Sequence, residues 1–395
     1  MRKNTWTNSG SRAEKVVPNL TARFHSRLDE IDAIRWNALL PDDNPFLEHA
    51  FLSGLEQHGC LDSAHGWTPH HLGLYESGRL AAAAPVYLKG NSHGEFVFDW
   101  SWAHAYARHG LDYYPKLLCA VPYSPVTGTR LLGDPALHAN LIDAMRAECD
   151  RLGLSSAHAN FCTDTDATAF AERDEWLARF DWQFHWQNRG WRDFDDFLDS
   201  LKPKKRKNIR QERVHVQRAG VHCEIRHGDE IDAATWRCIH DFYAATFDEK
   251  GNYPALTLEF FRHLGNAMPR YVLAVLCRRG GDMIAMALLL RSRATLYGRY
   301  WGCTENIPGL HFEACYYQGI DYCLRHGLQR FEPGAQGEHK LARGFLPTLT
   351  RSFHYLADTR FRTAVADALA HEAAALHAYR DELLAHSPYA EGKSA

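Results

Sequence analysis

Residues that can move protons or stabilise negative charge crowd one short segment near the end of the chain. Glu332 lies where an expected strand, QRFEPGA, should end, and the loop that follows contains Glu338, His339, Lys340 and Arg343. A carboxylate or an imidazole can act as a general base, and a lysine ammonium can stabilise an oxyanion. Any one of these residues taken alone is better explained by a polar surface loop, but the segment as a whole favours a catalytic site.

A second candidate is the strongly basic segment KPKKRKNIRQERVHVQRAG at residues 202–220. It holds eight Lys and Arg against one Glu, a net charge of +7 in a chain whose formal charge is −3. We predict a helix over residues 204–218 with Lys207, Arg210 and Arg213 on one face, exposed and bordering a cleft. Such a face binds phosphates, either of a tRNA or of a sugar-nucleotide precursor, and the alternative is a solvated basic face.

Two further polar residues lie outside these segments. Arg299 falls in an expected central strand, LYGRYWGC at 296–303, where an arginine requires a partner, and Glu332 on a neighbouring strand is the predicted one. Two glycines in that strand indicate a bulge or the close approach of a ligand. Tyr123 lies in the loop VPYSPVTGTRLL at 121–132, where a ligand contact and a rigid structural loop are equally good explanations.

The elements that must position these residues form an internal repeat. A β-hairpin pattern at 71–88, with a Ser-Gly turn, corresponds to a second hairpin pattern at 271–290 with a Gly-Gly-Asp turn. Each hairpin is followed by another expected strand, FVFDWSWA at 96–103 and LYGRYWGC at 296–303.

The correspondence continues through a helix in each half. The two helical stretches end in CDRLGL and CLRHGL, which share the pattern C-x-R-x-G-L, with Gly153 and Gly327 as C-caps 174 residues apart. The strands SSAHANF and QRFEPGA come next, which makes His158 the counterpart of Glu332. A similar final strand closes each half. The same order of elements in both halves favours a duplicated α/β domain.

We therefore predict two domains, at residues 21–195 and 196–395, after a disordered N-terminal stretch at 1–20. Each domain is expected to build its own sheet. The second domain would begin with the basic helix at 204–218 and end with one long helix that starts near Phe361.

Composition excludes several classes of protein. Of the 395 residues, 45% are hydrophobic and 24% are charged, which is typical of a globular protein and not of a disordered, collagen-like or coiled-coil chain. The apolar runs at 80–88 and 283–290 are shorter than the roughly 18–20 residues of a membrane span, and the start lacks a secretory signal. We expect a cytoplasmic protein. The ten cysteines form no CxxC pair, no HExxH is present, and we expect neither disulfides nor a metal site.

Three stretches carry a family resemblance, namely NPFLEHAFLSGLEQHGC at 44–60, YYPKLLCAVPYSPVTGTRLL at 113–132 and FEPGAQGEHKLARGFLPTLTRSFHYL at 331–356. With the basic helix between the halves, they resemble the FemABX-like group of predicted N-acyltransferases labelled "peptidoglycan biosynthesis/recognition". The order hairpin, strand, helix, strand, strand is also similar to the GNAT acyltransferase fold. The resemblance implies an α/β fold with mixed sheets, built as two tandem duplicated GNAT-like domains.

The resemblance implies transfer of an acyl or aminoacyl group to an amine acceptor, for example a cell-wall or other anionic precursor. Glu332, Glu338 or His339 would take the proton of the amine, and Lys340 would hold the oxyanion. FemABX proteins have a lysine in a similar F-K-x-x-F-G stretch, and the pattern here, H-K-L-A-R-G-F, is one residue longer. The expected substrate- and phosphate-binding residues are Lys207, Arg210, Arg213, Arg299, Tyr123 and Arg343.

The acyl donor stays open between acyl-CoA and aminoacyl-tRNA. GNAT enzymes that use acyl-CoA carry R/Q-x-x-G-x-G/A, which holds the pyrophosphate at a helix N-terminus. Neither TENIPGLHFEAC at 304–315 nor HAYARHGLDYYP at 104–115 has the full motif, although Gly309 and Gly110 each precede an expected helix. The alternative to an enzyme is a non-catalytic recognition module that binds an anionic glycan precursor or RNA. The oligomeric state also stays open.

Overall fold

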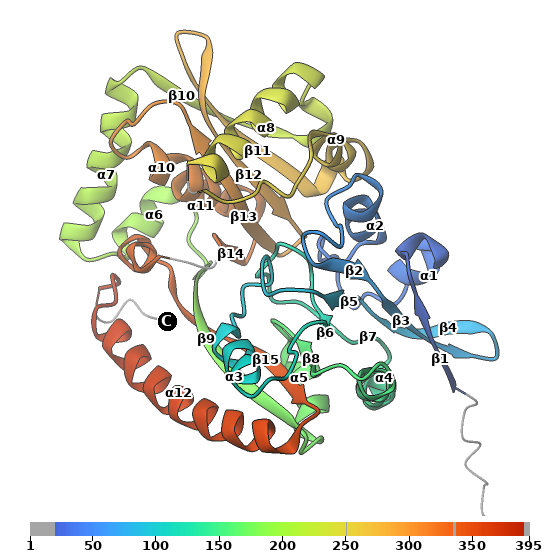
Figure 1. Ribbon diagram of the computed structural model, residues 1–395. Helices are drawn as coiled ribbons and strands as arrows, with labels where there is room; N and C mark the ends of the chain where they lie inside the picture. Colours follow the sequence, from blue (N-terminus) through green and yellow to red (C-terminus); the bar gives the residue numbers. More distant parts are fainter. Residues whose placement is uncertain (1–19, 250, 335–336, 391–395) are drawn as a thin grey trace, which may run out of the picture.

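The computed structural model describes residues 20–249, 251–334 and 337–390. It is a mixed α/β protein with one eleven-stranded and one four-stranded sheet, and helices pack on both (Figure 1). The four-stranded sheet has the order β1-β3-β4-β7 and the eleven-stranded sheet the order β10-β11-β12-β13-β14-β9-β15-β8-β6-β5-β2. The expected α/β fold with mixed sheets is therefore confirmed.

The first half contains the predicted hairpin, bent at a proline. Its strands are β1 (Leu20–His25), β2 (Trp67–Pro69), β3 (His71–Glu76), β4 (Arg79–Ala84), β5 (Val86–Lys89), β6 (Lys116–Cys119), β7 (Leu132–Gly133), β8 (Ser156–Ala159) and β9 (Trp176–Gln187). Pro85 separates β4 from β5, and a proline cannot donate to a ladder. As a result, β3 and β4 join the small sheet while β5 continues into the large one.

The second half repeats this order without the break. Its strands are β10 (Val221–His227), β11 (Val272–Arg279), β12 (Asp282–Arg291), β13 (Thr295–Cys303), β14 (Arg330–Glu332) and β15 (Leu346–Leu356). The hairpin of β11 and β12 turns at Gly280 and Gly281, whose φ angles of 60° and 98° require glycine. β14 runs parallel to β13, as β8 runs parallel to β6. This is the repeat that the sequence predicts.

The last strand of each half pairs with the other half. β9 pairs with β14 of the second half, and β15 pairs with β8 of the first half. The two exchanged strands also pair with each other, from Leu346 opposite His185 to Tyr355 opposite Trp176. The expectation of one separate sheet per half is therefore wrong, because the exchange fuses the main strands of both halves into one sheet at the centre of the molecule (Figure 1).

Twelve α-helices lie within the described residues. They are α1 (Ala33–Asn37), α2 (His49–Gln57), α3 (Trp100–Arg108), α4 (His138–Arg151), α5 (Asp164–Ala171), α6 (Phe194–Asp199), α7 (Pro203–Arg218), α8 (Ala233–Asp248), α9 (Leu258–Ala267), α10 (Leu310–Phe312), α11 (Gln318–His326) and α12 (Thr359–Ala385). Both predicted C-cap glycines have a positive φ, 66° at Gly153 and 68° at Gly327. The basic helix and the long C-terminal helix are confirmed as α7 and α12.

The segment FVFDWSWA is not a strand. Residues 96–99 form a loop, and α3 begins at Trp100. Trp102 and Tyr106, four residues apart, form one helical face that packs with Val365 and Leu369 of α12. The counterpart of β13 is instead β6, and Gly110 follows α3 rather than preceding a helix.

The two halves also share a hydrophobic core. Phe51 of α2 and Phe260 of α9 belong to one buried cluster, and their ring centroids lie 5.5 Å apart. In the part of the chain that the structure covers, no helix combines the length and the apolar character of a membrane span. The predicted disordered stretch at 1–20 lies, except for Leu20 of β1, outside the described residues. The boundary between 195 and 196 stays a prediction.

The strand exchange predicts that neither half folds alone. Residues 21–195 expressed as a separate chain would leave β8 and β9 without β15, and residues 196–395 would leave β14 without β9. Unpaired edges of this kind expose backbone donors and acceptors. We expect each half alone to lack a cooperative thermal transition, and the co-expressed halves to copurify and regain one. A cooperative, monomeric half on its own would contradict the exchange.

Candidate functional site

A pocket of about 240 Å³ opens where β13 and β14 separate. The pairing of β12 with β13 shifts between Leu288 and Leu289, which leaves Arg299 as the extra residue of a β-bulge. The lining residues are Ala287, Leu288, Leu289, Gly298, Arg299, Tyr300, Trp301, His311, Cys315, Tyr316, Pro333, Gly334, His339 and Lys340. A Cβ on Gly298 would lie 3.2 Å from Cα of Pro333. A glycine at this position therefore allows the backbones of β13 and Pro333 to lie close together at the edge of the pocket.

Lys340 brings a buried positive charge to this pocket. It lies in a short 3-10 helix, η6 (Glu338–Arg343), and is 2% exposed. Its Nζ donates a hydrogen bond of 2.6 Å to the carbonyl oxygen of Gly334. Burial lowers the pKa of Lys340 to about 8, so the amine remains mainly protonated at pH 7. An ammonium has three protons, and two remain for a ligand.

His339 lines the same pocket beside Lys340. Its Nε2 lies 2.8 Å from the hydroxyl of Tyr316, and the side chain is exposed. Although the residue is exposed overall, partial burial of the ring, followed by the charges of Lys340 and Arg343, lowers the pKa of His339, which favours the neutral imidazole at pH 7. Tyr316 and Cys315 come from a π-helical turn, η5 (Glu313–Tyr317), a rare geometry found often at functional sites.

Glu332 lies beneath the pocket rather than in its wall. Its Oε1 is 3.0 Å from Nε of Arg330, without hydrogen-bond alignment, and 4.0 Å from Nδ1 of His185. Burial raises the pKa of Glu332 to about 7 and lowers that of His185 to about 3. The expected ion pair of Glu332 with Arg299 is not formed.

Arg299 and Tyr123 instead connect the two halves. Nη2 of Arg299 donates to the carbonyl oxygen of Tyr123 at 2.6 Å, and the Tyr123 hydroxyl donates to the carbonyl oxygen of Cys60 at 3.0 Å. Burial raises the pKa of Tyr123. Arg299 thus both lines the pocket and holds the loop at 121–132 against it. The side chain of Glu338 lies outside the described part of the structure.

Arg343, the last residue of η6, is buried and belongs to a network of hydrogen bonds. Its Nη2 lies 2.7 Å from Oε1 of Glu212, its Nε donates to the Tyr317 hydroxyl, and its Nη1 donates to the carbonyl oxygen of His339. Tyr317 donates a short hydrogen bond to Glu212 as well. These contacts join α7 to the loop that holds Lys340, and they occupy much of the guanidinium.

The three cations of α7 divide between two sides of the helix. Lys207 and Arg210 are exposed and line a shallow groove of about 600 Å³ along the outer face. Arg210 approaches Asp195 at 3.5 Å. Arg213 points the other way and pairs with both carboxylate oxygens of Glu313, at 3.0 and 3.1 Å. Lys207 and Arg210 therefore line the same surface groove. Arg213 does not belong to this exposed face and packs against Glu313 instead.

The equivalent position in the first half is filled. There, β6 and β8 separate after Cys119 and Ala159, and the fully buried Arg130 occupies the gap. Its guanidinium donates to the carbonyl oxygens of Asn160, Gly128 and Val126 at 2.7 to 3.0 Å. These hydrogen bonds fix the loop that follows β6 against the end of β8.

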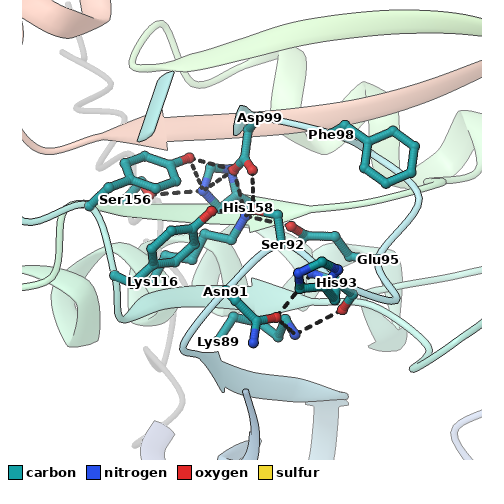
Figure 2. A network of polar contacts seen from close by, with 12 residues as sticks. Lys89, Asn91, Ser92, His93, Glu95, Phe98, Asp99, Lys116, Ser156 and His158 are labelled. Carbon is teal, nitrogen blue, oxygen red and sulfur yellow. Dashed lines mark hydrogen bonds and ion pairs between the residues drawn. The ribbon is translucent and has the colours of Figure 1, made fainter. Parts of the chain in front are cut away.

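A buried ionic network in the first half was not predicted from the sequence (Figure 2). Nζ of Lys116, 1% exposed, lies 2.7 Å from Oε1 of Glu95 and 2.5 Å from Oδ2 of Asp99. Ser92 and Tyr113 donate to the same Asp99 carboxylate. The network fastens the loop before α3 onto β6. A lysine at the start of the apolar strand KLLC was the signal available for it.

Two histidines complete this network. Nδ1 of His158 lies 2.7 Å from Nδ1 of His354, so strands β8 and β15 meet here through side chains as well. Burial lowers the pKa of His158 to about 3 and holds that of His354 well below its usual range. Although burial disfavours its charge, the Lys116 ammonium and the hydrogen bonds from Lys116 and Ser92 keep the pKa of Asp99 well below the ordinary value. His158, the predicted counterpart of Glu332, is thus a neutral structural residue at pH 7.

We expect Lys116→Met to destabilise the protein by about 3–5 kcal/mol, because it leaves two buried carboxylates without a cation. Urea unfolding followed by circular dichroism measures the change. Lys204→Met on the exposed side of α7 removes the same charge and should alter stability by at most about 0.5 kcal/mol. Equal losses in both variants would show that the buried network is not what matters.

We expect Glu332→Gln to raise the melting temperature above pH 7. The raised pKa means that the folded state holds a proton between about pH 4.5 and 7 that the unfolded state has lost, so the stability of the native protein falls as the pH rises through this window. The amide removes that loss, and the gain should disappear at pH 4. Glu172→Gln at the surface should show no such pH-dependent gain. A lower melting temperature for Glu332→Gln at pH 8 would refute the assignment.

Comparisons with known proteins were made for the whole chain. The FemAB-like family model, described as peptidoglycan biosynthesis/recognition, matches residues 27–391. Among solved structures, FemX aligns with a TM-score of 0.50 at 11% identity, over 88% of this chain and all of that one. A search of curated proteins found no match.

Two further solved structures have TM-scores of 0.51. One, from Agrobacterium fabrum, is described as the C-terminal domain of a lysylphosphatidylglycerol synthetase, with 11% identity over 86% of this chain and 96% of that one. The other is a protein of unknown function from Bacteroides thetaiotaomicron, with 12% identity over 85% of this chain and 99% of that one. At these identities the alignments show a shared fold and nothing more. Because the family model spans nearly the whole chain, the protein belongs to the FemAB-like family.

Proposed function

We propose that the protein is an N-acyltransferase that moves an acyl or aminoacyl group onto an amine in the pocket of Lys340. One observation carries the proposal: a buried ammonium and a neutral imidazole, adjacent in sequence, line the same pocket at the point where β13 and β14 separate. Family membership supports transfer chemistry of this class.

The reaction would proceed by attack of the acceptor amine on the acyl carbonyl carbon. A nitrogen–carbon bond forms, and the carbonyl oxygen becomes an oxyanion. Collapse of this intermediate breaks the carbon–sulfur bond of a thioester or the carbon–oxygen bond of an ester. The amine gives up one proton, and the leaving thiol or hydroxyl takes one, so no further reactant is required.

Lys340 would stabilise the oxyanion. Its Nζ is fixed by one hydrogen bond to Gly334, and its burial excludes water, which strengthens the interaction of the ammonium with a developing negative charge. The charge must be present for this role, and a pKa of about 8 preserves it near neutral pH.

His339 is the better candidate for the base. Its ring lines the pocket and is neutral at pH 7, whereas the Glu332 carboxylate lies below the pocket wall. Tyr316 holds the ring in place through its contact with Nε2. Glu332 would then act on the pocket only through its neighbours on the sheet.

The packing of α7 favours aminoacyl-tRNA over acyl-CoA as the donor. Gly309, at the start of the helical segment after β13, lies against the backbone of Glu212, and a Cβ there would be 2.9 Å from its carbonyl oxygen. The carboxylates of Glu212 and Glu313 flank the same helix start. Because the two carboxylates already pair with Arg343 and Arg213, it is the covering helix that opposes a pyrophosphate there, while Lys207 and Arg210 face outward, where a nucleic-acid backbone could lie. The acceptor we propose is a peptidoglycan precursor with a free amine.

The test is transfer of a labelled amino acid from charged tRNA to a peptidoglycan precursor peptide, with labelled acetyl-CoA as the competing donor. We expect Lys340→Met to reduce turnover by about 10²–10³-fold, the scale of one lost oxyanion donor. The native rate should fall above about pH 8, where Lys340 loses its proton. Lys340→Arg should move this alkaline limit upward.

His339→Gln should reduce the rate and remove the acidic limb of the pH profile, while Arg79→Met on the exposed part of β4 serves as a control for general charge loss. A folded Lys340→Met variant with full activity would exclude this pocket from the mechanism. Tight binding of the precursor without any transfer from either donor would favour the recognition module instead.

A further inference from the structure

A second hollow, of about 560 Å³, lies where the chain enters β11 and where β12 turns into β13. It is lined by Asp43, His227, Arg270, Tyr271, Arg291, Ser292 and Arg293. Three guanidinium groups thus converge on one concavity that contains a single carboxylate. None of these residues takes part in the chemistry proposed above, and none belongs to α7.

The positive charge in the hollow is only partly compensated. Asp43 accepts a hydrogen bond from the backbone nitrogen of Arg293 at 2.9 Å and lies 3.3 Å from its Nε. Within the described ranges, Arg270 and Arg291 have no carboxylate within ion-pair distance. Arg270 lies over the ring of Tyr271, at 5.2 Å from its centroid. Two uncompensated cations at one hollow favour an anion there.

Arg291 is held ready for such a ligand. Its Nε donates to the carbonyl oxygen of Ser292 at 3.1 Å, and its Nη1 donates to the hydroxyl of Tyr322 at 2.8 Å. The guanidinium carbon also lies 5.6 Å from the centroid of the Tyr322 ring. A fixed guanidinium loses little conformational entropy when it binds a phosphate with its remaining nitrogen.

The local electrostatics support the same conclusion. His326 lies against Tyr322, with ring centroids 4.1 Å apart and the two ring planes tilted by 32°. Its pKa is lowered by burial and then by the positive charges of Arg291, Arg325 and His227. The charge of Arg291, which acts on this imidazole in addition to burial, is the part of the shift that favours a negative ligand nearby.

We propose that this hollow binds a phosphate dianion, as a phosphate ester or diphosphate, at a site separate from the transfer pocket. Guanidinium groups match the paired oxygens of a phosphate, and two or three of them can neutralise a dianion. The phosphate can come from a free phosphorylated metabolite or from a lipid headgroup. Binding at this site does not require turnover, so it can be measured whatever the outcome for the transferase.

Calorimetric titration of the full chain with inorganic pyrophosphate tests the site. We expect Arg270→Gln and Arg291→Gln each to weaken binding by about 10- to 100-fold, the effect of losing one charged hydrogen-bond donor. Tyr322→Phe should weaken it less, since it removes only the support of Arg291. Arg278→Gln, at the far end of β11, removes the same charge and should leave the affinity unchanged. Circular dichroism checks that each variant is folded.

Two further experiments complete the test, one with variants of α7 and one with lipid vesicles. Lys207→Gln with Arg210→Gln removes charge from α7, and binding that disappears only in this double variant would overturn the proposal. Sedimentation with phosphatidylcholine vesicles containing phosphatidic acid tests the lipid source. Vesicle binding that requires Arg270 and Arg291 would assign the site to a lipid phosphate, and pyrophosphate binding that requires them would assign it to a soluble one. Dependence of neither ligand on these arginines would refute the site.

Discussion

The antiparallel pairing of β9 with β15 is the constraint on which the rest of the molecule depends. This ladder runs from Leu346 opposite His185 to Tyr355 opposite Trp176, and each strand also serves as the edge partner of the opposite half. A slip of one residue would turn every side chain to the other face. It would also displace η6, which leads directly into β15, and with it Lys340. The position of the candidate catalytic group is thus set by strand register more than by its own loop.

The two halves have the same pair of parallel strands, but different residues lie where these strands separate. Where β13 and β14 separate, a bulge at Arg299 and a glycine at 298 leave a pocket. Where β6 and β8 separate, the buried Arg130 donates hydrogen bonds to three backbone carbonyl oxygens. The first half holds a buried charged group in the Lys116 network, which fastens the loop before α3 onto β6. The second half thus contains the pocket of Lys340, and the first half contains the buried Lys116 network.

Local patterns in the sequence predicted the local structure well. The hairpin turns, the C-cap glycines, α7 and α12 follow from residue spacing alone, because turn and cap geometry depend on a few adjacent residues. The sequence patterns did not predict the strand exchange, the Lys116 network or the burial of Arg343. Each of these depends on partners more than a hundred residues away or on which face of a strand is covered. The segment FVFDWSWA was misread as a strand because its aromatic residues satisfy both periodicities, and packing against α12 decides for the helix. Of the predicted site, Lys340, His339 and Arg299 meet in one pocket, whereas Glu332 lies beneath it and Arg213 and Arg343 join elements.

The strand exchange has a consequence for how the protein is made. β8 is synthesised long before β15, yet β15 is the strand that completes its side of the sheet. At about 5–20 residues per second, the ribosome needs roughly 10–40 s to produce the intervening chain. During that interval the nascent first half carries an open β-edge and an unfinished core, and it cannot reach its final structure while it is being translated. Contacts between such distant segments also slow folding. The last strand to leave the ribosome therefore closes both halves at once, and a chain truncated before β15 would be released with neither half complete.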